Sequence, residues 1–243
     1  MFSFYFALSV IPAFLLLGYF YWLDKNRKEP GEAILKVFAL GIFLLVPDLV
    51  IEIIVGYILF GRPIISAGEQ AVLKNAILVG VVQAALIEET VKMLFMIILV
   101  YQLKEFDERA DGVVYTVVLG LGFAAVENFI YVIQGGALIG FLRAVTAVPM
   151  HACASTLMGY FIGKSKFTLP YKRPFLIFAG WILAIMFHGV YNTLAFLQNY
   201  YSLFILVIVG GGIILSVKLM SMLVAEDKED LVLMSFLKQQ PGP

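Results

Sequence analysis

The feature that most constrains this chain is a charged motif inside an apolar stretch. Residues 76–101 are almost entirely apolar, yet their middle carries Glu88, Glu89 and Lys92. A charged side chain in hydrocarbon costs roughly 2.5 to 3.5 kcal/mol on insertion scales, so such residues face a protein interior or a wet cavity and usually have a function. On a helix Lys92 lies one turn from both glutamates, and its ammonium can neutralise either carboxylate but not both. The motif indicates a site inside a membrane; the alternative is an ion pair that fixes helix packing.

The composition favours a membrane protein with several spans. Of the 243 residues, 62% are hydrophobic and only 14% are charged, and a soluble domain with such a surface would precipitate. The formal net charge of zero argues against a nucleic-acid partner. The single cysteine, Cys153, excludes an internal disulfide and a zinc site built from several cysteines. The first residues lack the positive charge of a cleavable signal peptide, so we expect them to begin the first span.

Seven apolar runs are long enough to cross a membrane, since a spanning helix needs about 20 residues. We therefore predict an all-α, polytopic membrane helix bundle with about seven transmembrane helices. The predicted spans are residues 2–23, 33–60, 76–101, 113–133, 138–162, 175–197 and 203–224. No connection is long enough to fold separately, so we assign residues 1–224 to one transmembrane domain and residues 225–243 to a short cytoplasmic tail.

Lysine and arginine are concentrated on one side of the predicted membrane. Eleven of them lie in the tail and in the loops after the first, third and fifth spans. The opposite side has only Arg62 and Lys74, both in the loop after the second span. The positive-inside rule therefore predicts an outside N-terminus and a cytoplasmic C-terminus.

Polar residues occur at one depth on four predicted spans. Glu88, Glu127, His151 and His188 each lie roughly 11 to 14 residues from the cytoplasmic end of a span, which is about 17 to 21 Å along a helix. The two histidines are the only ones in the chain. Unrelated packing defects would scatter in depth, so a shared depth predicts a shared site.

Further polar residues are expected to support this site. Tyr191 and Asn192 follow His188 by about one turn, so either can orient its imidazole. Arg143, eight residues before His151, can bind a substrate carbonyl, pair with an acid or extend toward the outer surface. The supporting residues that we predict are Lys92, Asn128, Arg143, Tyr191 and Asn192.

The second predicted span contributes two more acids near the same depth. Asp48 directly follows Pro47, and Glu52 lies one turn further on. Because proline frees a backbone carbonyl and can bend the helix, these acids would line a water path, and a purely structural role fits equally well.

These residue types support two related chemistries. In the first, a glutamate takes a proton from water, the water attacks a peptide carbonyl, and a histidine or asparagine holds the developing oxyanion without any metal. In the second, His151, His188 and Glu127 bind zinc, and Glu88 or Glu89 serves as the base. The sequence alone leaves both open.

The motifs resemble those of the PrsW family of intramembrane proteases, over the first span to about the seventh. The matching segments are Glu88-Glu89-x-x-Lys92, Phe123-Ala124-x-x-Glu127-Asn128, Arg143 with His151 eight residues later, and His188-Gly189-x-Tyr191-Asn192. The resemblance implies a multi-pass endopeptidase of the bacterial plasma membrane, distantly similar to the CAAX prenyl endopeptidases. It also implies that the substrate is a membrane-bound anti-sigma factor, whose first cut begins release of an extracytoplasmic-function sigma factor.

The resemblance further implies roles for single residues. Glu88, Glu89 and His188 would be essential, with Glu127 and His151 in the same site. Asn192 stands where some family members have aspartate, which favours a hydrogen-bonding role. Both glutamate-dependent and metal-dependent mechanisms have been described for the family, so the resemblance does not choose between them.

The predicted depth places the site about 10 Å from the outer boundary of the membrane. We therefore expect a single-pass membrane protein to be cut near its outer face. Two other classes of function stay open. A proton-coupled transporter would have polar residues strung through the bilayer, and a non-catalytic scaffold would keep its function after Glu88→Gln and Glu89→Gln.

Overall fold

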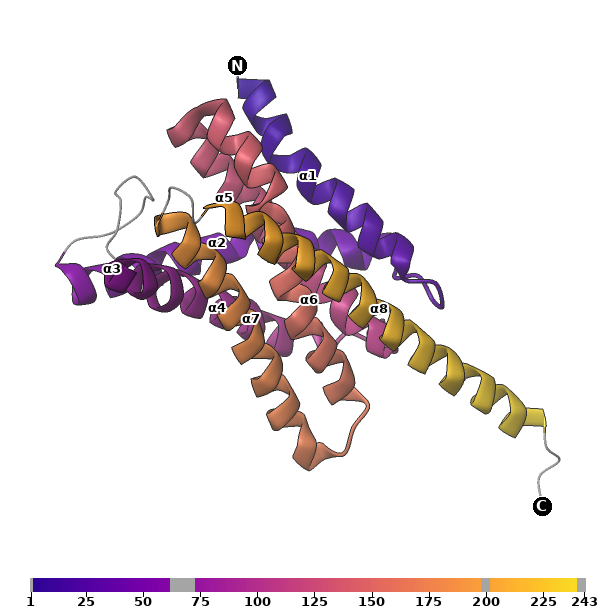
Figure 1. Cartoon of the computed structure of the whole chain (residues 1–243). Coiled ribbons are helices and arrows are strands. Elements are labelled where there is room, and N and C mark those ends of the chain that lie inside the picture. The colour runs from indigo at the N-terminus through magenta and orange to yellow at the C-terminus, as the bar shows by residue number, and fades with distance from the viewer. Residues whose placement is uncertain (1, 62–72, 198–201, 240–243) are drawn as a thin grey trace.

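A computed structural model describes residues 2–61, 73–197 and 202–239 of the chain (Figure 1). These residues form helices and short connections, with no strand among them, as the sequence predicts. The helices are α1 (Phe2–Leu23), α2 (Gly31–Phe60), α3 (Leu73–Ile77), η1 (Leu78–Ala85), α4 (Leu86–Phe95), η2 (Met96–Val100), α5 (Arg109–Val145), α6 (Ala147–Lys166), η3 (Pro170–Lys172), α7 (Arg173–Leu197) and α8 (Ser202–Gln239).

Five stretches of the described residues are long and apolar enough to cross a membrane. They are Ser3–Leu23, Gly31–Phe60, Arg109–Lys166, Pro170–Leu197 and Leu203–Ser235. The count of seven spans is not confirmed, for two reasons. The predicted spans 113–133 and 138–162 fall within one of the five stretches, and the predicted span 76–101 is not a single long helix.

The stretch from Leu73 to Val100 is a series of four helical segments instead of one α-helix. The widened π-helical segments η1 and η2 lie directly before and after α4, which carries the charged motif. Single π-turns inside helices often occur at functional sites. Nothing in the apolar composition of residues 76–101 signals the wider turns.

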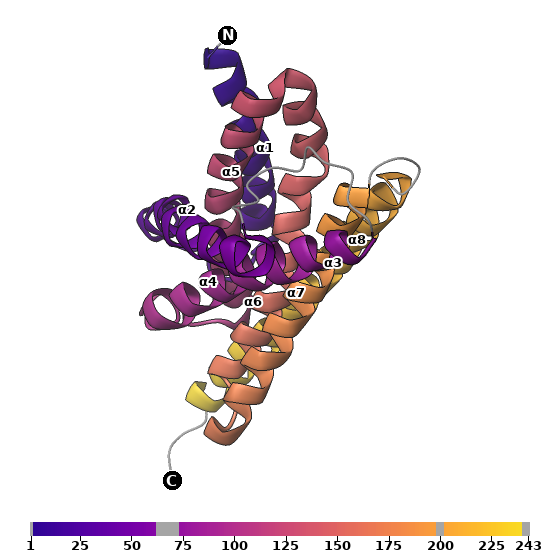
Figure 2. The same cartoon turned by 90° about the vertical axis from the view of Figure 1, so that its left-hand side faces the viewer.

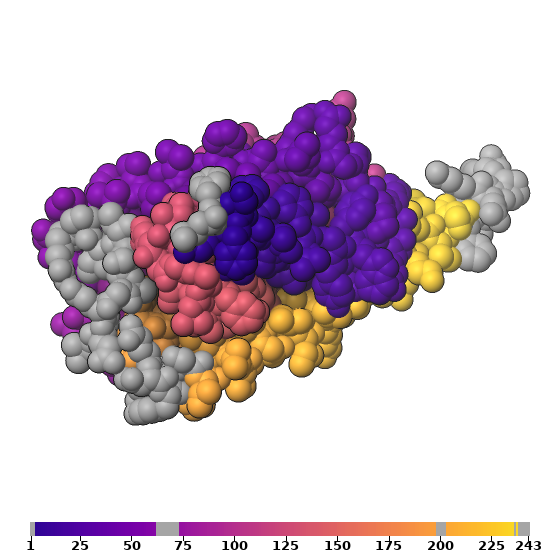
Figure 3. All heavy atoms as spheres, turned by 90° about the horizontal axis from the view of Figure 1, so that it is seen from above, coloured from indigo at the N-terminus to yellow at the C-terminus, as the bar shows by residue number. Residues whose placement is uncertain are grey.

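Helix α5 forms the centre of the bundle and packs against α1, α2 and α6. Its residues 110–125 are buried without interruption. This burial all round explains why the segment is apolar on every face, unlike a surface helix. In Figure 3, α1 covers the middle of one face of the bundle, with α2 on one side and α8 on the other.

Two glycine positions fix how α5 and α6 meet. A Cβ added to Gly159 would collide with the backbone of Gly112, so only glycine lets the two helices approach this closely. Further along, Gly136 has a φ of 78°, which separates two helical parts of α5. Figure 2 shows the chain rising through α5 and returning at this reversal toward α6.

The connections that we predicted to share the cytoplasmic side do lie together. Asn26 donates to the Val224 carbonyl (2.8 Å), and Arg27 pairs with Asp107 (2.6 Å). The start of α1 and the end of α8 lie at opposite ends of the molecule (Figure 1). Which end is cytoplasmic stays a prediction, and Arg62, part of the reasoning for it, lies outside the described residues.

Helix α8 continues past the predicted domain boundary at residue 224 and docks on the start of α5. The Asp227 carboxylate accepts from the backbone N–H groups of Arg109 (3.1 Å) and Ala110 (2.9 Å), so it caps the N-terminus of a helix far away in sequence. Asp111 in turn accepts from the backbone N–H of Glu108 (2.6 Å). We call Asp24, Glu108, Arg109, Asp111 and Asp227 the helix-end cluster.

Two acids of the helix-end cluster hold protons more tightly than usual. Burial raises the pKa of Asp24 to about 6, and burial, reinforced by the charge of Asp227, raises the pKa of Glu108 to about 7. Both lie outside the stretches that can span a membrane.

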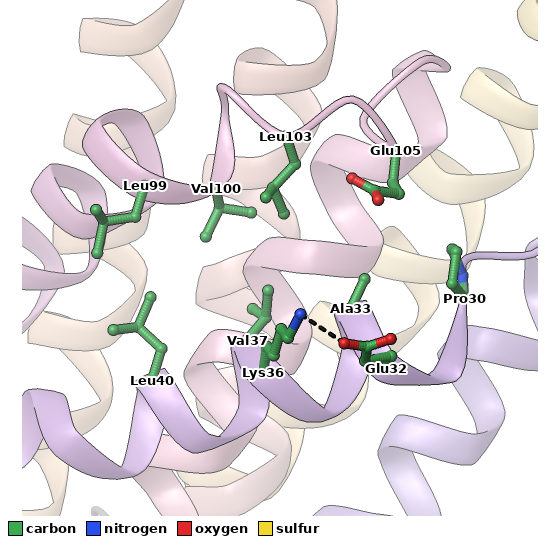
Figure 4. Close-up of a pocket in the computed structure, with 10 residues that line it drawn as sticks. All are labelled: Pro30, Glu32, Ala33, Lys36, Val37, Leu40, Leu99, Val100, Leu103 and Glu105. Carbon is green, nitrogen blue, oxygen red and sulfur yellow. Dashed lines mark ion pairs between the residues drawn. The ribbon is translucent and has the colours of Figure 1, made fainter.

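A pocket of about 240 Å³ lies between the start of α2 and the segment that links η2 to α5 (Figure 4). Apolar side chains such as Leu40 and Leu103 line it, and the exposed Glu32–Lys36 pair (2.7 Å) lies at its edge. None of the predicted site residues lines this pocket.

Candidate functional site

The predicted site residues of α4, α6 and α7 meet in the interior of the bundle. One donor atom from each of Glu88, Glu89, His151 and His188 lies within 4.8 Å of the other three. Glu88 is 5% exposed, and the other three are at most 1% exposed. With Lys92, which is equally inaccessible, these residues form what we call the buried cluster.

Lys92 holds the buried cluster together. Its ammonium donates to Glu88 Oε2 (3.1 Å) and Glu89 Oε1 (2.8 Å) and lies 3.2 Å from His151 Nδ1. The ring of Phe123 covers the ammonium at 4.4 Å, a cation–π contact. The spacing on one helix predicts that Lys92 can reach both glutamates, and the structure shows its ammonium bonded to both.

The two histidines are held in different forms by their partners. An ammonium can only donate, so His151 Nδ1 accepts from Lys92 and its Nε2–H donates to Glu127 Oε2 (2.8 Å). His188 lies with Nδ1 2.8 Å from Glu89 Oε1, so Nδ1 donates to this carboxylate, and a neutral ring would carry its lone pair on Nε2. His188 Nε2 is 3.8 Å from Glu88 Oε1, which makes no hydrogen bond with the described residues.

Glu127 lies beside the buried cluster and joins it to α5. Its carboxylate bonds His151 through one oxygen and Arg143 Nη2 through the other (2.8 Å). Arg143 also donates to Asn128 Oδ1 (3.3 Å) and lies over the ring of Tyr131 (3.7 Å). Of the three roles that the sequence allowed for Arg143, the structure shows the pairing with an acid.

Two predicted supporting residues, Tyr191 and Asn192, make no hydrogen bond to His188. The Tyr191 hydroxyl pairs with Thr146 Oγ1 (3.1 Å), a residue that no sequence pattern singled out. The Asn192 side chain makes no hydrogen bond with the described residues. The residue that orients the imidazole of His188 is Glu89, not Tyr191 or Asn192.

Sequence reasoning also missed how α4 is held from α7. Trp181 Nε1 donates to Thr90 Oγ1 (3.1 Å), one residue after the glutamate pair. An isolated tryptophan and threonine in apolar runs carry no signal of this contact, because only the packing of α4 on α7 brings them together.

The donor types and spacing of the buried cluster fit a metal ion. Two ligands of one zinc ion lie about 3 to 4 Å apart, as His188 Nε2 and Glu88 Oε1 do at 3.8 Å. Glu89 Oε2 is buried and has no hydrogen-bond partner among the described residues, and such an orphaned oxygen suits a cation. This set differs from the predicted one, because Glu127 bonds His151 instead of sharing a centre with both histidines.

Comparison with known proteins gives one family. Residues 29–222 match the model of the PrsW family intramembrane metalloproteases. A Protease PrsW of Geobacillus kaustophilus is 36% identical over 76% of this chain and 77% of its own length. The Protease PrsW of Oceanobacillus iheyensis is 35% identical and that of Bacillus subtilis 31% identical, each over 76% of this chain and 79% of its own length. No solved structure matches the chain.

Proposed function

This chain belongs to the PrsW family of intramembrane metalloproteases, and from this premise we propose that it hydrolyses a peptide bond at the buried cluster. The observation that supports this most is the meeting of two glutamates and two histidines from three helices within 4.8 Å. Carboxylates and imidazoles gathered at one point suit hydrolysis better than transport, which needs polar groups along a path.

Glu88 is the general base in this proposal. Its Oε1 makes no hydrogen bond with the described residues and faces the lone pair of His188 Nε2 at 3.8 Å. A water bound between these two atoms would be polarised by both and would lose its proton to the carboxylate. Glu89 instead has one oxygen bonded to both Lys92 and His188, so its role is to orient them.

Lys92 and Glu127 keep the reacting groups in place. Because Lys92 fixes Glu88 Oε2, the other oxygen of that carboxylate points toward the site. Glu127 fixes the tautomer of His151 in the way that carboxylates orient metal-binding or catalytic histidines. Truncating either residue would therefore misplace the groups that act on the substrate.

If the enzyme uses a metal ion, the residues that would hold it are Glu88, Glu89, His151 and His188, and Glu88 would then be a ligand instead of the base. Zinc bound there would polarise the scissile carbonyl and make water more acidic. His151 Nδ1 already accepts from Lys92, so this hydrogen bond and a metal bond at the same atom exclude one another.

We further propose that the enzyme resides in the bacterial plasma membrane, with its N-terminus outside, and cuts a single-pass protein near the outer face. The charge distribution of the loops and the resemblance of the four motifs support this assignment. The same resemblance supports an anti-sigma factor as the substrate, cut once to begin release of its sigma factor.

Reconstitution in vesicles with a labelled single-pass substrate tests the proposal. We expect the wild type to give fragments that end near the outer face, and Glu88→Gln and His188→Ala to lower kcat by roughly 10²- to 10⁴-fold. Metal analysis of the purified protein and addition of a chelator separate the two mechanisms. Full activity in metal-free protein would rule out the zinc form, and undiminished cleavage by Glu88→Gln would overturn the assignment of the base.

A further inference from the structure

Helix α2 brings two acids to the buried cluster that none of the four motifs contains. Asp48 is 2% exposed, although it is a carboxylate on a helix of largely apolar residues. Glu52 lies one turn further along the same face and is half-buried. Both interact electrostatically with Glu88, Glu127 and Lys92, so they face the site and not the lipid.

The cations near these acids already have partners. Lys92 is bonded to both glutamates of α4, and Arg143 is bonded to Glu127. Asp48 Oδ1 is buried without a hydrogen-bond partner in the described part of the chain. A buried carboxylate oxygen left this way is unfavourable unless some other group bonds it.

The accessible side of the site lies between α2 and α5. The innermost residues, Glu89, His151 and His188, are at most 1% exposed, whereas the Glu127 and Arg143 side chains are each 16% exposed. Tyr131, next to Arg143, also interacts with Glu52 on the opposite helix. The less buried side of the site therefore has Glu52 on its α2 wall and Arg143 on its α5 wall.

The wall that carries Glu52 is tied to the helix before α4. Gln83 of η1 is buried, and its Nε2 donates to the backbone carbonyl of Glu52 at 3.4 Å. This bond sets the depth of α2 relative to the segment that leads into Glu88. The backbone of α2 at Glu52 is thus tied to the segment that leads into the base.

A substrate at this site must present an unfolded backbone. Its peptide bond is open to attack only where the helix has come apart, and in a membrane each freed N–H then needs a new acceptor. The wall of α2 offers such acceptors in Asp48 Oδ1 and the Glu52 carboxylate. Neither is committed to a cation of its own among the described residues.

We propose that Asp48 and Glu52 are positioning residues that accept hydrogen bonds from backbone N–H groups of the unwound substrate and so hold its scissile carbonyl next to Glu88. This inference rests on the proposed proteolytic function. It assigns binding, not chemistry, to α2, and it predicts an effect on KM with little effect on kcat.

The test uses the full-length protein in vesicles and two synthetic single-pass substrates that differ by one N-methyl group on an amide beside the cleaved bond. We expect Glu52→Met to raise KM about tenfold, the loss of one hydrogen bond, and to leave kcat within about twofold. Glu52→Gln keeps an acceptor oxygen, so its KM should stay close to that of the wild type. Glu32→Met, on the same helix but exposed far from the site, is the matched control.

The methylated substrate makes the assignment specific. N-methylation should raise KM for the wild type by a similar factor and add nothing further in Glu52→Met, because the same hydrogen bond has already been lost. Additive losses, or an unchanged KM in both Glu52→Met and Asp48→Leu, would overturn the inference. If the wild type itself cleaves neither substrate, the proposed function fails instead, so the two failures are distinguishable.

Discussion

The buried cluster and the helix-end cluster both gather acids, but they are bonded in different ways. In the helix-end cluster, Asp111 and Asp227 accept from backbone N–H groups at the start of α5, whose positions the helix fixes. In the buried cluster, the contacts among the described residues join one side chain to another, and Lys92 contacts Glu88, Glu89 and His151. Acids that bond to backbone N–H groups stabilise the packing of the helices. Side chains that bond only to other side chains can exchange partners during a reaction.

The largest expected effect comes from removing the cation of the buried cluster. Lys92→Met leaves two buried carboxylates without their shared ammonium, so we expect it to lower the free energy of unfolding by about 3 to 5 kcal/mol. Thermal unfolding in detergent would measure this. Lys36→Met removes an exposed lysine whose partner is Glu32 and should change the stability little, because exposed ion pairs contribute little. Equal losses in the two variants would contradict the comparison.

A smaller effect, on rate, is expected at the edge of the buried cluster. Glu127→Gln keeps an acceptor for His151 but removes the charge that pairs with Arg143, so cleavage should fall by roughly 10- to 100-fold. Cleavage rates in vesicles, normalised to folded protein, would show it. Glu105→Gln, an exposed residue outside both clusters, should cleave like the wild type.

In the helix-end cluster we expect a substitution to lower stability but not the rate of cleavage. Asp227→Ala removes a cap from two backbone N–H groups of α5, so we expect a loss of about 0.5 to 2 kcal/mol in stability. The rate of cleavage per folded molecule should not change. A variant that unfolds like the wild type but cleaves slowly would mean that α8 takes part in catalysis.

The smallest expected effect is a pH dependence confined to the helix-end cluster. Burial raises the pKa of Glu108 from 4.5 to about 7, so the folded state binds this proton more tightly than the unfolded state. The stabilisation is therefore complete below about pH 4.5 and is lost as the pH rises through about 7. Unfolding temperatures of Glu108→Gln, which cannot titrate, should fall less over this range than those of the wild type. Equal changes in the unfolding temperatures of Glu108→Gln and the wild type over this pH range would contradict the assignment to Glu108.

The sequence predicted the meeting of the site residues better than the form of the helices. A common depth for Glu88, His151 and His188 follows from residue counting, and the structure brings these three together. The catalytic roles assigned to them stay predictions. The cap that Asp227 places on α5 could not be foreseen, because it depends on where α8 crosses a helix more than a hundred residues earlier in the chain.

Partner choice inside the site was also beyond sequence reasoning. The spacing of His188 and Asn192 suggested that the amide would orient the imidazole. In the structure, Glu89 of α4 orients the imidazole of His188 on α7. Helical spacing identifies neighbours on one helix, whereas packing decides which neighbour from another helix comes closer.

The two wide turns that flank α4 make the winding of the helix itself a determinant of activity. A π-turn holds more residues than an α-turn, so the residues of η1 would wind further around the helix axis if they formed an ordinary α-helix. Everything after η1 would then be rotated relative to what precedes it. Glu88 and Glu89 would leave the face that meets His188, although no chemical group had been removed.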